Sequence, residues 1–168
     1  MNGQLINDSL TYDLMHTQST NKQLNCLLCA QTGGKMIWSD ASCRVVDAQD
    51  DSYPGLTRVI WQDHVAEMTD LEIATRQHLM QVVLIVEDVM RQQLQPQKVN
   101  LASLGNHVPH LHWHIIPRWS DDATFPDPIW AAIKREDEKV VARREAIETL
   151  LPSYHLALQQ RLTMTSSV

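Results

Sequence analysis

The sequence predicts a single α+β domain, built around a mostly antiparallel sheet and two helices. Two observations predict this fold class: short segments rich in β-branched and aromatic residues, and longer segments in which apolar residues recur at helical spacing. Along the chain these segments follow the order strands, helix, strands, helix, which is typical of α+β folds. The chain has 168 residues and no recognisable linker between residues 26 and 150, so we expect one hydrophobic core.

Five segments have the composition of strands. The first two are separated by Asp40, Ala41 and Ser42, which favour a hairpin-like turn, and a stretch dense in turn formers precedes the third. We predict strands over residues 36–39, 43–47, 56–62, 98–104 and 111–118.

Two further segments are predicted to be helical. Thr69 and Glu72 have the spacing of a capping box, which predicts a helix with Thr69 as its N-cap residue. Apolar residues then recur at helical spacing, so this helix should run to about Gln93. A second, highly charged helix is expected over residues 129–150, ending before Pro152 because proline interrupts helical hydrogen bonding.

Composition and charge exclude several classes of partner. The net charge is −6 and no block of Lys and Arg is present, so we expect no long nucleic acid as a partner. No apolar run is long enough to span a membrane, and no signal peptide is recognisable. Three cysteines, an odd number, argue against a disulfide framework. Together these features predict a cytoplasmic protein without a membrane partner.

The most informative feature is a cluster of histidines between two prolines. Pro109 and Pro117 bracket seven residues, too few for a stable helix and rich in strand formers. On a strand, alternate side chains share a face and lie about 6.6 Å apart. His110, His112 and His114 should therefore form a row on one face, with Leu111, Trp113 and Ile115 on the core face.

Three chemical causes can explain three histidines in alternate register. They are metal binding by the rings, phosphate chemistry in which one neutral ring attacks phosphorus, and a pH switch. The pH switch is the weakest explanation because it needs no strict period of two. Along a strand the first and third rings are about 13 Å apart at the backbone, so one metal ion does not suit all three. Mixed roles for the three rings are therefore favoured.

A pair of cysteines is the second chemical feature. Cys26 and Cys29 are separated by two residues, a spacing found in redox pairs and in structural metal half-sites, and one that also arises by coincidence. No second pair with this spacing is present, so any zinc ion would need other ligands. Two cysteines and two histidines are one accepted tetrahedral set for zinc.

The segment from His110 to Ile116 resembles the signature of the histidine triad family, in which three histidines alternate with apolar residues. The preceding residues 100–109 and the following Pro117 and Arg118 are also similar to that family. Upstream, the cysteine pair, the turn at residues 53–55 and His64 occur in the family's usual order. The resemblance covers residues 26–119, and residues 122–130 are similar to a bacterial branch of the family.

The resemblance implies a histidine-triad fold: a five-stranded antiparallel sheet with a long central helix, to which we add the C-terminal helix. It also implies a homodimer that binds a purine nucleotide and cleaves a phosphoramidate, an anhydride or a related bond at the α-phosphate. By position, His112 is the nucleophile that forms a nucleotidyl intermediate, and His114 contacts the phosphate and assists the leaving group. Asn100, Gly105 and Asn106 are the other expected nucleotide contacts.

The resemblance further implies a structural zinc ion and no organic cofactor. Some members complete a zinc site with the histidine before the long helix and the first histidine of the triad. The expected ligands here are Cys26, Cys29, His64 and His110. The alternative is that the cysteines are reduced core residues.

We divide the chain into a polar extension (1–22), the histidine-triad domain (23–120) and a C-terminal extension with a helix packed on that domain (121–168). Trp119 and Trp130 are candidates to cover the nucleotide pocket or to pack at a dimer interface, and we interpret both as packing residues. The leading function is a nucleotide hydrolase or nucleotidyltransferase. The alternatives are a non-catalytic nucleotide- or zinc-binding module, and a metal-dependent enzyme that uses the triad as ligands.

Overall fold

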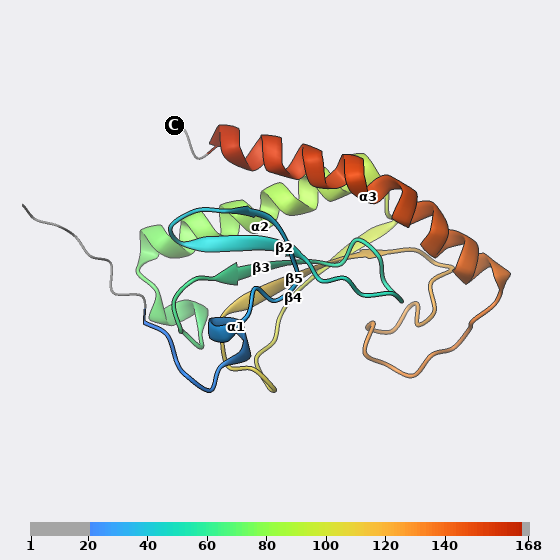
Figure 1. Cartoon of the computed structure of the whole chain (residues 1–168). Helices are drawn as coiled ribbons and strands as arrows, with labels where there is room; N and C mark the ends of the chain where they lie inside the picture. Colours follow the sequence, from blue (N-terminus) through green and yellow to red (C-terminus); the bar gives the residue numbers. More distant parts are fainter. Residues whose placement is uncertain (1–20, 166–168) are drawn as a thin grey trace, which may run out of the picture.

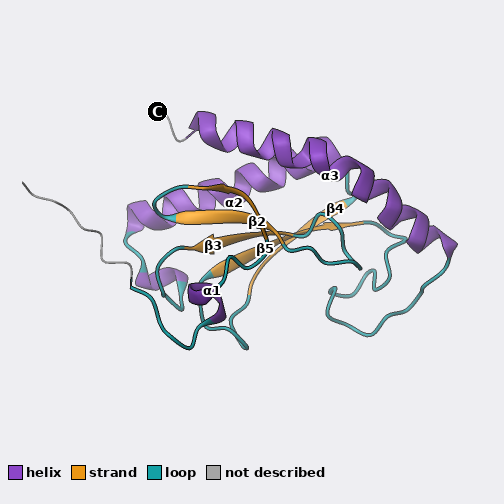
Figure 2. Cartoon of the chain, in the orientation of Figure 1, coloured by secondary structure: helices purple, strands orange, loops and turns teal. Residues whose placement is uncertain are grey.

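Five strands form one antiparallel sheet in the order β1-β2-β3-β5-β4 (Figures 1 and 2). The computed structural model describes residues 21–165, so the predicted extension over residues 1–22 lies almost wholly outside the described residues. The predicted five-stranded sheet is confirmed, with every strand boundary within one residue of its expected position. The strands are β1 (Lys35–Ser39), β2 (Cys43–Asp47), β3 (Thr57–Trp61), β4 (Lys98–Ser103) and β5 (His112–Arg118).

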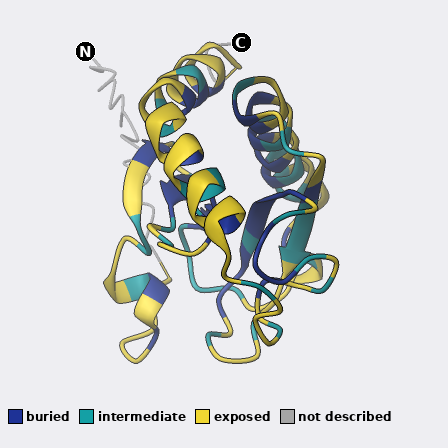
Figure 3. Ribbon diagram, turned by 90° about the vertical axis from the view of Figure 1, so that its right-hand side faces the viewer, coloured by how far each residue is buried: buried dark blue, intermediate teal, exposed yellow. Residues whose placement is uncertain are grey.

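Two long helices cover one face of this sheet. The helix α2 (Ile73–Leu94) packs on β3 and β5, and α3 (Glu138–Thr165) packs on α2 and β1. Figure 3 shows exposed residues on the outer surfaces of the helices and buried residues where helices and strands meet. Among the described residues, no helix is both long and apolar enough to cross a lipid bilayer.

The start of α2 corrects one sequence prediction. Thr69 lies in a short 3-10 turn (Met68–Asp70), and α2 begins four residues after it, behind Glu72, whose side chain makes no capping hydrogen bond. Leu71 separates the two elements in an extended conformation and is buried in the core. Burial of this side chain takes the chain out of helical geometry, so the capping box does not form.

The C-terminal helix is present, but its predicted boundaries of 129–150 are wrong. It begins at Glu138, where Asp137 Oδ1 accepts hydrogen bonds from the N–H groups of Lys139 and Val140. It continues through Pro152, and its axis changes direction near the middle (Figure 1). Apolar burial on both sides of Pro152 outweighs the cost of about 3 kcal/mol for an internal proline. The buried residues are Val140, Ile147, Tyr154, Leu158 and Leu162.

In the part of the chain that the structure describes, the other face of the sheet carries no long helix. One part of it is covered by the single turn α1 (Leu27–Ala30), which the sequence analysis did not predict, where Leu28 packs with Val46 and Ile60. Another part is covered by the segment before α3, where Ile129 packs with Ile116. In Figure 1 these segments lie on the side of the sheet opposite α2 and α3. The histidines of β5 therefore lie between two small apolar clusters, outside the main core.

A buried arginine anchors the segment that follows β5. Arg118 is 2% exposed, and its Nε and Nη2 donate to the two carboxylate oxygens of Asp122 at 2.6 and 3.1 Å. The same guanidinium donates to the Asp127 carbonyl oxygen at 2.8 Å and to Asn100 Oδ1 at 2.9 Å. Because planar guanidinium groups satisfy several acceptors at once, this one residue ties the loop to both β5 and β4.

Replacement of Arg118 by Met should lower the free energy of unfolding by about 3–5 kcal/mol, because the Asp122 carboxylate would remain buried without its partner. Urea denaturation measures this change. Lys134→Met is the control, since Lys134 forms a half-exposed ion pair with Asp127 and should cost less than about 1 kcal/mol. Equal losses in the two variants would contradict the anchoring role.

Candidate functional site

Pairing with the neighbouring strands fixes the positions of two histidines. On β5, His112 lies opposite Ile60, and His114 lies between Arg58 of β3 and Ala102 of β4. The two rings contact each other edge to face, with centroids 4.9 Å apart. Ile115, the residue after His114, is on the opposite face and fully buried in the core, as the period of two predicts.

His110 does not continue the row of histidines. It precedes the first residue of β5, and its ring points to the cysteines of the α1 segment. The regular strand cannot extend to it because Leu111, the next residue, bonds through its N–H to the Val65 carbonyl in the loop after β3. The predicted face of three aligned imidazoles is therefore corrected to two aligned imidazoles and one that turns away.

Two backbone carbonyls determine which ring nitrogens carry protons. His112 Nδ1 lies 2.6 Å from the carbonyl oxygen of His110, and His110 Nε2 lies 2.8 Å from that of Trp61. A carbonyl oxygen only accepts hydrogen bonds, so each of these nitrogens must be the protonated donor. The remaining nitrogens, His112 Nε2 and His110 Nδ1, therefore carry free lone pairs. The first suits nucleophilic attack, and the second suits metal binding.

Burial keeps all three imidazoles neutral. His110, His112 and His114 are each less than 10% exposed, and this burial is the main cause that lowers their pKa values. The positive charge of Arg58 lowers the pKa values of His112 and His114 further. For His114, the pKa falls to about 4. Neutral rings retain the lone pairs needed for attack on phosphorus.

Two cavities of about 340 and 480 Å³ meet at His112 and His114. One is bounded by α1, Gly33 and Ala48; the other is bounded by residues 104–108 and Trp130. Cavities of this size suit a small organic ligand. The site therefore has a nucleophilic ring beside space for substrate.

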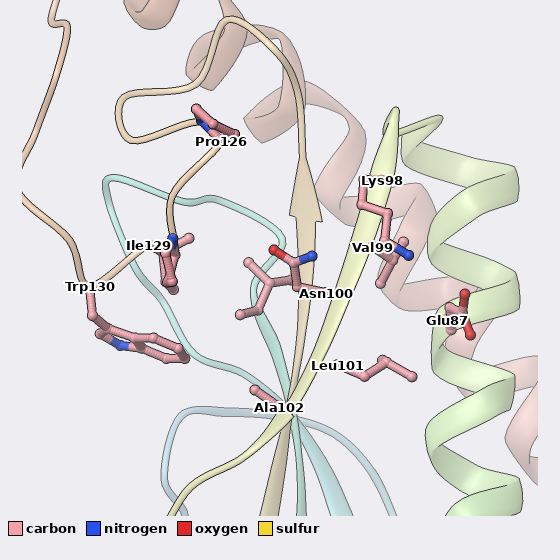
Figure 4. A pocket seen from close by; sticks show the side chains of 11 residues that line it. Glu87, Lys98, Val99, Asn100, Leu101, Ala102, Pro126, Ile129 and Trp130 are labelled. Atoms are coloured by element: carbon pink, nitrogen blue, oxygen red, sulfur yellow. The ribbon is translucent and has the colours of Figure 1, made fainter.

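The predicted nucleotide contacts fall in two places. Gly105 and Asn106 line the 480 Å³ cavity together with the two histidines. Asn100 instead lies opposite Ile116, two residues before Ala102, the β4 residue that is paired with His114. Its Oδ1 accepts a hydrogen bond from Arg118. Figure 4 shows Asn100 in an adjoining groove, facing the segment that carries Ile129 and Trp130. The structure brings Gly105 and Asn106 to the histidines and leaves Asn100 beyond Trp130.

The four predicted metal ligands converge on one point. One ligand atom from each of Cys26, Cys29, His64 and His110 lies within 4.8 Å of all the others. His110 Nδ1 lies 3.4 Å from Cys26 Sγ and 3.5 Å from Cys29 Sγ, and His64 Nδ1 lies 3.5 Å from Cys29 Sγ. Tetrahedral zinc with ordinary bond lengths separates sulfur and nitrogen ligands by about 3.6 Å. The donor set and its spacing fit zinc.

Local structure explains why the cysteines converge. The turn α1 places Cys26 and Cys29 on one side, and both thiols are free. Arg44 on β2 holds this turn, because its guanidinium donates to the carbonyl oxygens of Leu28 and Thr32. The backbone N–H of Gln23 donates to Cys29 Sγ at 3.4 Å, as it would to a metal-bound thiolate.

Comparison with known families decides the classification. The model of the HIT domain, the histidine-triad domain, matches residues 30–121, which is more than half of the chain. The chain belongs to the HIT family. This is a family of nucleotide-binding proteins and hydrolases, as the sequence resemblance implied. The matched segment contains all three triad histidines and His64, whereas Cys26 and Cys29 precede it.

Solved structures of bacterial HIT proteins share the fold. A histidine triad protein from Bradyrhizobium japonicum is 27% identical, with a TM-score of 0.56 over 71% of this chain and 91% of the other. One from Marinobacter aquaeolei is 23% identical, with a TM-score of 0.63 over 86% and 98%. A zinc-bound family protein from Mycobacterium smegmatis is 21% identical, with a TM-score of 0.52 over 85% and 96%. No curated protein sequence matches the chain.

Two residues at the HIT site were not chosen as site residues from the sequence. Trp130 was interpreted as a packing residue, but it is 54% exposed and its ring contacts that of His114 edge to face at 5.4 Å. Trp119, in contrast, is buried in the core. Arg58 was read only as part of a strand, although alternation along β3 places it on the face of His114. No local sequence pattern contains the pairing of β3 with β5, which places Arg58, or the path of the loop that places Trp130.

His114 should titrate with a pKa of about 4, well below the ordinary histidine value near 6.5. Between these values the unfolded chain binds a proton at this position and the native chain does not. Its contribution to stability is therefore complete above about pH 6.5 and is lost as the pH falls toward 4. NMR titration of histidine-labelled protein measures the pKa directly, and a midpoint for His114 above 6 would contradict this picture.

Proposed function

We propose that this HIT protein hydrolyses or transfers a nucleoside monophosphate group, using His112 as the nucleophile. The observation that carries the proposal is the 2.6 Å contact between His112 Nδ1 and the His110 carbonyl oxygen. This hydrogen bond leaves the lone pair on Nε2, at a ring that lines both cavities. The expected substrate is a purine nucleotide conjugate, either a phosphoramidate or a dinucleoside polyphosphate.

The proposed reaction has two displacement steps at the α-phosphorus. In the first, His112 Nε2 forms a bond to phosphorus, and the bond to the leaving group breaks with its electron pair, which takes up a proton from water. In the second, the oxygen of water or another acceptor bonds to phosphorus, the N–P bond breaks and the acceptor's proton is released. His112 then returns to its starting neutral form, and the product of hydrolysis is a nucleoside monophosphate.

The other residues have proposed roles in binding. His114, kept neutral by burial, contacts the phosphoryl oxygens and assists the leaving group, and Gly105 and Asn106 contact the nucleotide from the 480 Å³ cavity. Asn100 reaches only a part of the substrate that extends past Trp130 into the adjoining groove. The homodimer implied by the family resemblance is also part of this proposal.

We further propose that Cys26, Cys29, His64 and His110 bind a structural zinc ion. Zinc in such a closed site stabilises the fold. The support comes from the convergence of the four ligand atoms and from the zinc-bound relative. Among the described residues, neither His112 nor His114 belongs to a cluster of potential metal ligands, which disfavours a metal-dependent enzyme that uses the whole triad as ligands.

Replacement of His112 by Ala should abolish AMP release from an adenosine phosphoramidate and from a diadenosine polyphosphate, with a loss in kcat of about 10³-fold or more. His78→Ala is the matched control, since His78 pairs with Asp40 away from the cavities. Turnover that is equal in wild type and His112→Ala would contradict the assigned nucleophile. Nucleotide binding without turnover by the wild type would favour the non-catalytic module.

The purified protein should contain one zinc ion per chain, and the double variant Cys26→Ser, Cys29→Ser should lose it. A chelator should lower the melting temperature of the wild type, because the metal stabilises only the folded state. His155→Ala is the control: His155 pairs with Asp47 and belongs to no cluster of potential metal ligands among the described residues, so this variant should retain the metal. Metal analysis by mass spectrometry that finds the same content in both variants would contradict the zinc site.

A further inference from the structure

An arginine lies directly beside the proposed nucleophilic site. Arg58 is paired with His114 across β3 and β5, and its alternate neighbour Ile60 is paired with His112. Side chains of paired residues lie on the same face of a sheet, so the Arg58 side chain and the two imidazoles share one face. Arg58 also lines both cavities that meet at His112 and His114.

The hydrogen bonds of Arg58 are incomplete, in contrast to those of the buried arginines elsewhere. Arg44 donates to three carbonyl oxygens and the Gln62 side chain, and Arg118 donates to two carboxylate oxygens and three further acceptors. Within residues 21–165, Arg58 donates only from Nη1, to the Gly33 carbonyl oxygen at 2.9 Å. Its Nε is buried and has no partner in the described part of the chain. A guanidinium with free donors has a strong tendency to bind an anion.

The charge of Arg58 is also uncompensated. No carboxylate in residues 21–165 forms an ion pair with Arg58. Burial is the main influence on the pKa of Arg58 and lowers it, whereas the charge of Asp50 raises it. Among the described residues that line the two cavities, Arg58 is the only arginine or lysine, and none is an aspartate or glutamate. The cavities therefore contain one fixed positive charge and no fixed negative charge.

Gly33 holds this guanidinium in place. Its φ of +85° is unfavourable for other residues, and a Cβ atom there would lie 2.7 Å from Ile60 Cδ1 and 2.9 Å from Leu28 Cδ2. The Gly33 carbonyl is thus fixed against the sheet, and it binds one end of the guanidinium. Within residues 21–165, Nη2 has no hydrogen-bond partner and, unlike Nε, is not enclosed by protein atoms, so it is the donor available to an anion in the cavities.

We propose that Arg58 is a phosphate-binding residue of this site, whose guanidinium binds anionic oxygens of the substrate's phosphoryl groups. This inference rests on the proposed function. A phosphoryl group within reach of His112 lies where the two cavities meet, so the α-phosphate is the expected ligand. A phosphate on the leaving group offers the same chemistry. The guanidinium compensates charge on the phosphoryl oxygens while His112 Nε2 attacks phosphorus, a role that the neutral ring of His114 cannot fill.

The proposal is tested by measuring the affinities of AMP and adenosine for wild type, Arg58→Met and Arg58→Lys by calorimetry. Loss of the charged hydrogen bonds should weaken AMP binding to Arg58→Met by about 10- to 100-fold, while adenosine binding stays unchanged. Arg58→Lys should retain part of the AMP affinity. The exposed Arg91→Met on α2 is the control for net charge and should bind AMP like wild type. Equal losses for AMP and adenosine would overturn the proposal, because they would indicate a purely structural role.

Turnover distinguishes the two phosphates. If AMP affinity is unchanged but kcat/KM of Arg58→Met falls about tenfold or more for diadenosine tetraphosphate alone, the contact is to the leaving phosphate, and the proposal holds. If neither AMP affinity nor kcat/KM for any substrate changes, the proposal is overturned while the proposed enzyme function stands.

Inorganic phosphate separates this proposal from the proposed function and needs no folded Arg58→Met variant. In the wild type, phosphate should shift the NMR signal of the Arg58 Nε–H group, which is identified by its absence in Arg58→Lys. A shift in a protein that neither binds nor cleaves nucleotides would support the anion site and contradict the nucleotide function. A signal that stays unchanged at saturating phosphate would overturn the phosphate-binding role.

Discussion

The backbone position of His110 is the constraint on which the site depends. Its carbonyl oxygen accepts the hydrogen bond that orients His112, while its own ring is held by the Trp61 carbonyl and turns toward the two cysteines. One residue therefore joins the proposed metal centre to the proposed nucleophile. A metal ion bound to the His110 ring would also restrict the position of the His110 carbonyl group. That carbonyl determines the tautomer of His112. This coupling explains how a structural metal can support the chemistry without taking part in it.

The two faces of the sheet have different roles, one in stability and the other in the proposed chemistry. Its helix-covered face contributes the apolar core in which Val59 and Ile115 are fully buried, whereas the opposite face carries His112, His114 and Arg58 between two small apolar clusters. Alternation along the strands is what allows both, since adjacent residues serve opposite faces. The Arg118 network then fixes the loop after β5, and that segment leads to Trp130, which contacts His114. Buried polar contacts thus hold the loop on this face.

Much of the fold could be predicted from the sequence because its local signals agree with the final packing. All five strands and the existence of both long helices follow from composition and periodicity, and the four potential metal ligands were selected through the family resemblance. The failures have physical causes that no local pattern contains. Leu71 is buried and breaks the predicted capping box, and packing on either side of Pro152 carries α3 through a residue that usually ends a helix. Arg58 was missed, and Trp130 was assigned to packing instead of to the pocket, because their proximity to His114 arises only from strand pairing and from the path of a loop.

The most direct test of the central claim is to look for the nucleotidyl group on His112 itself. Wild-type enzyme mixed with an adenosine phosphoramidate would be quenched in base within one turnover, digested, and mapped by mass spectrometry. The proposed mechanism predicts an adenylyl group on the peptide that contains His112, located on that residue by fragmentation. Turnover without any such adduct, or an adduct on another residue, would contradict it.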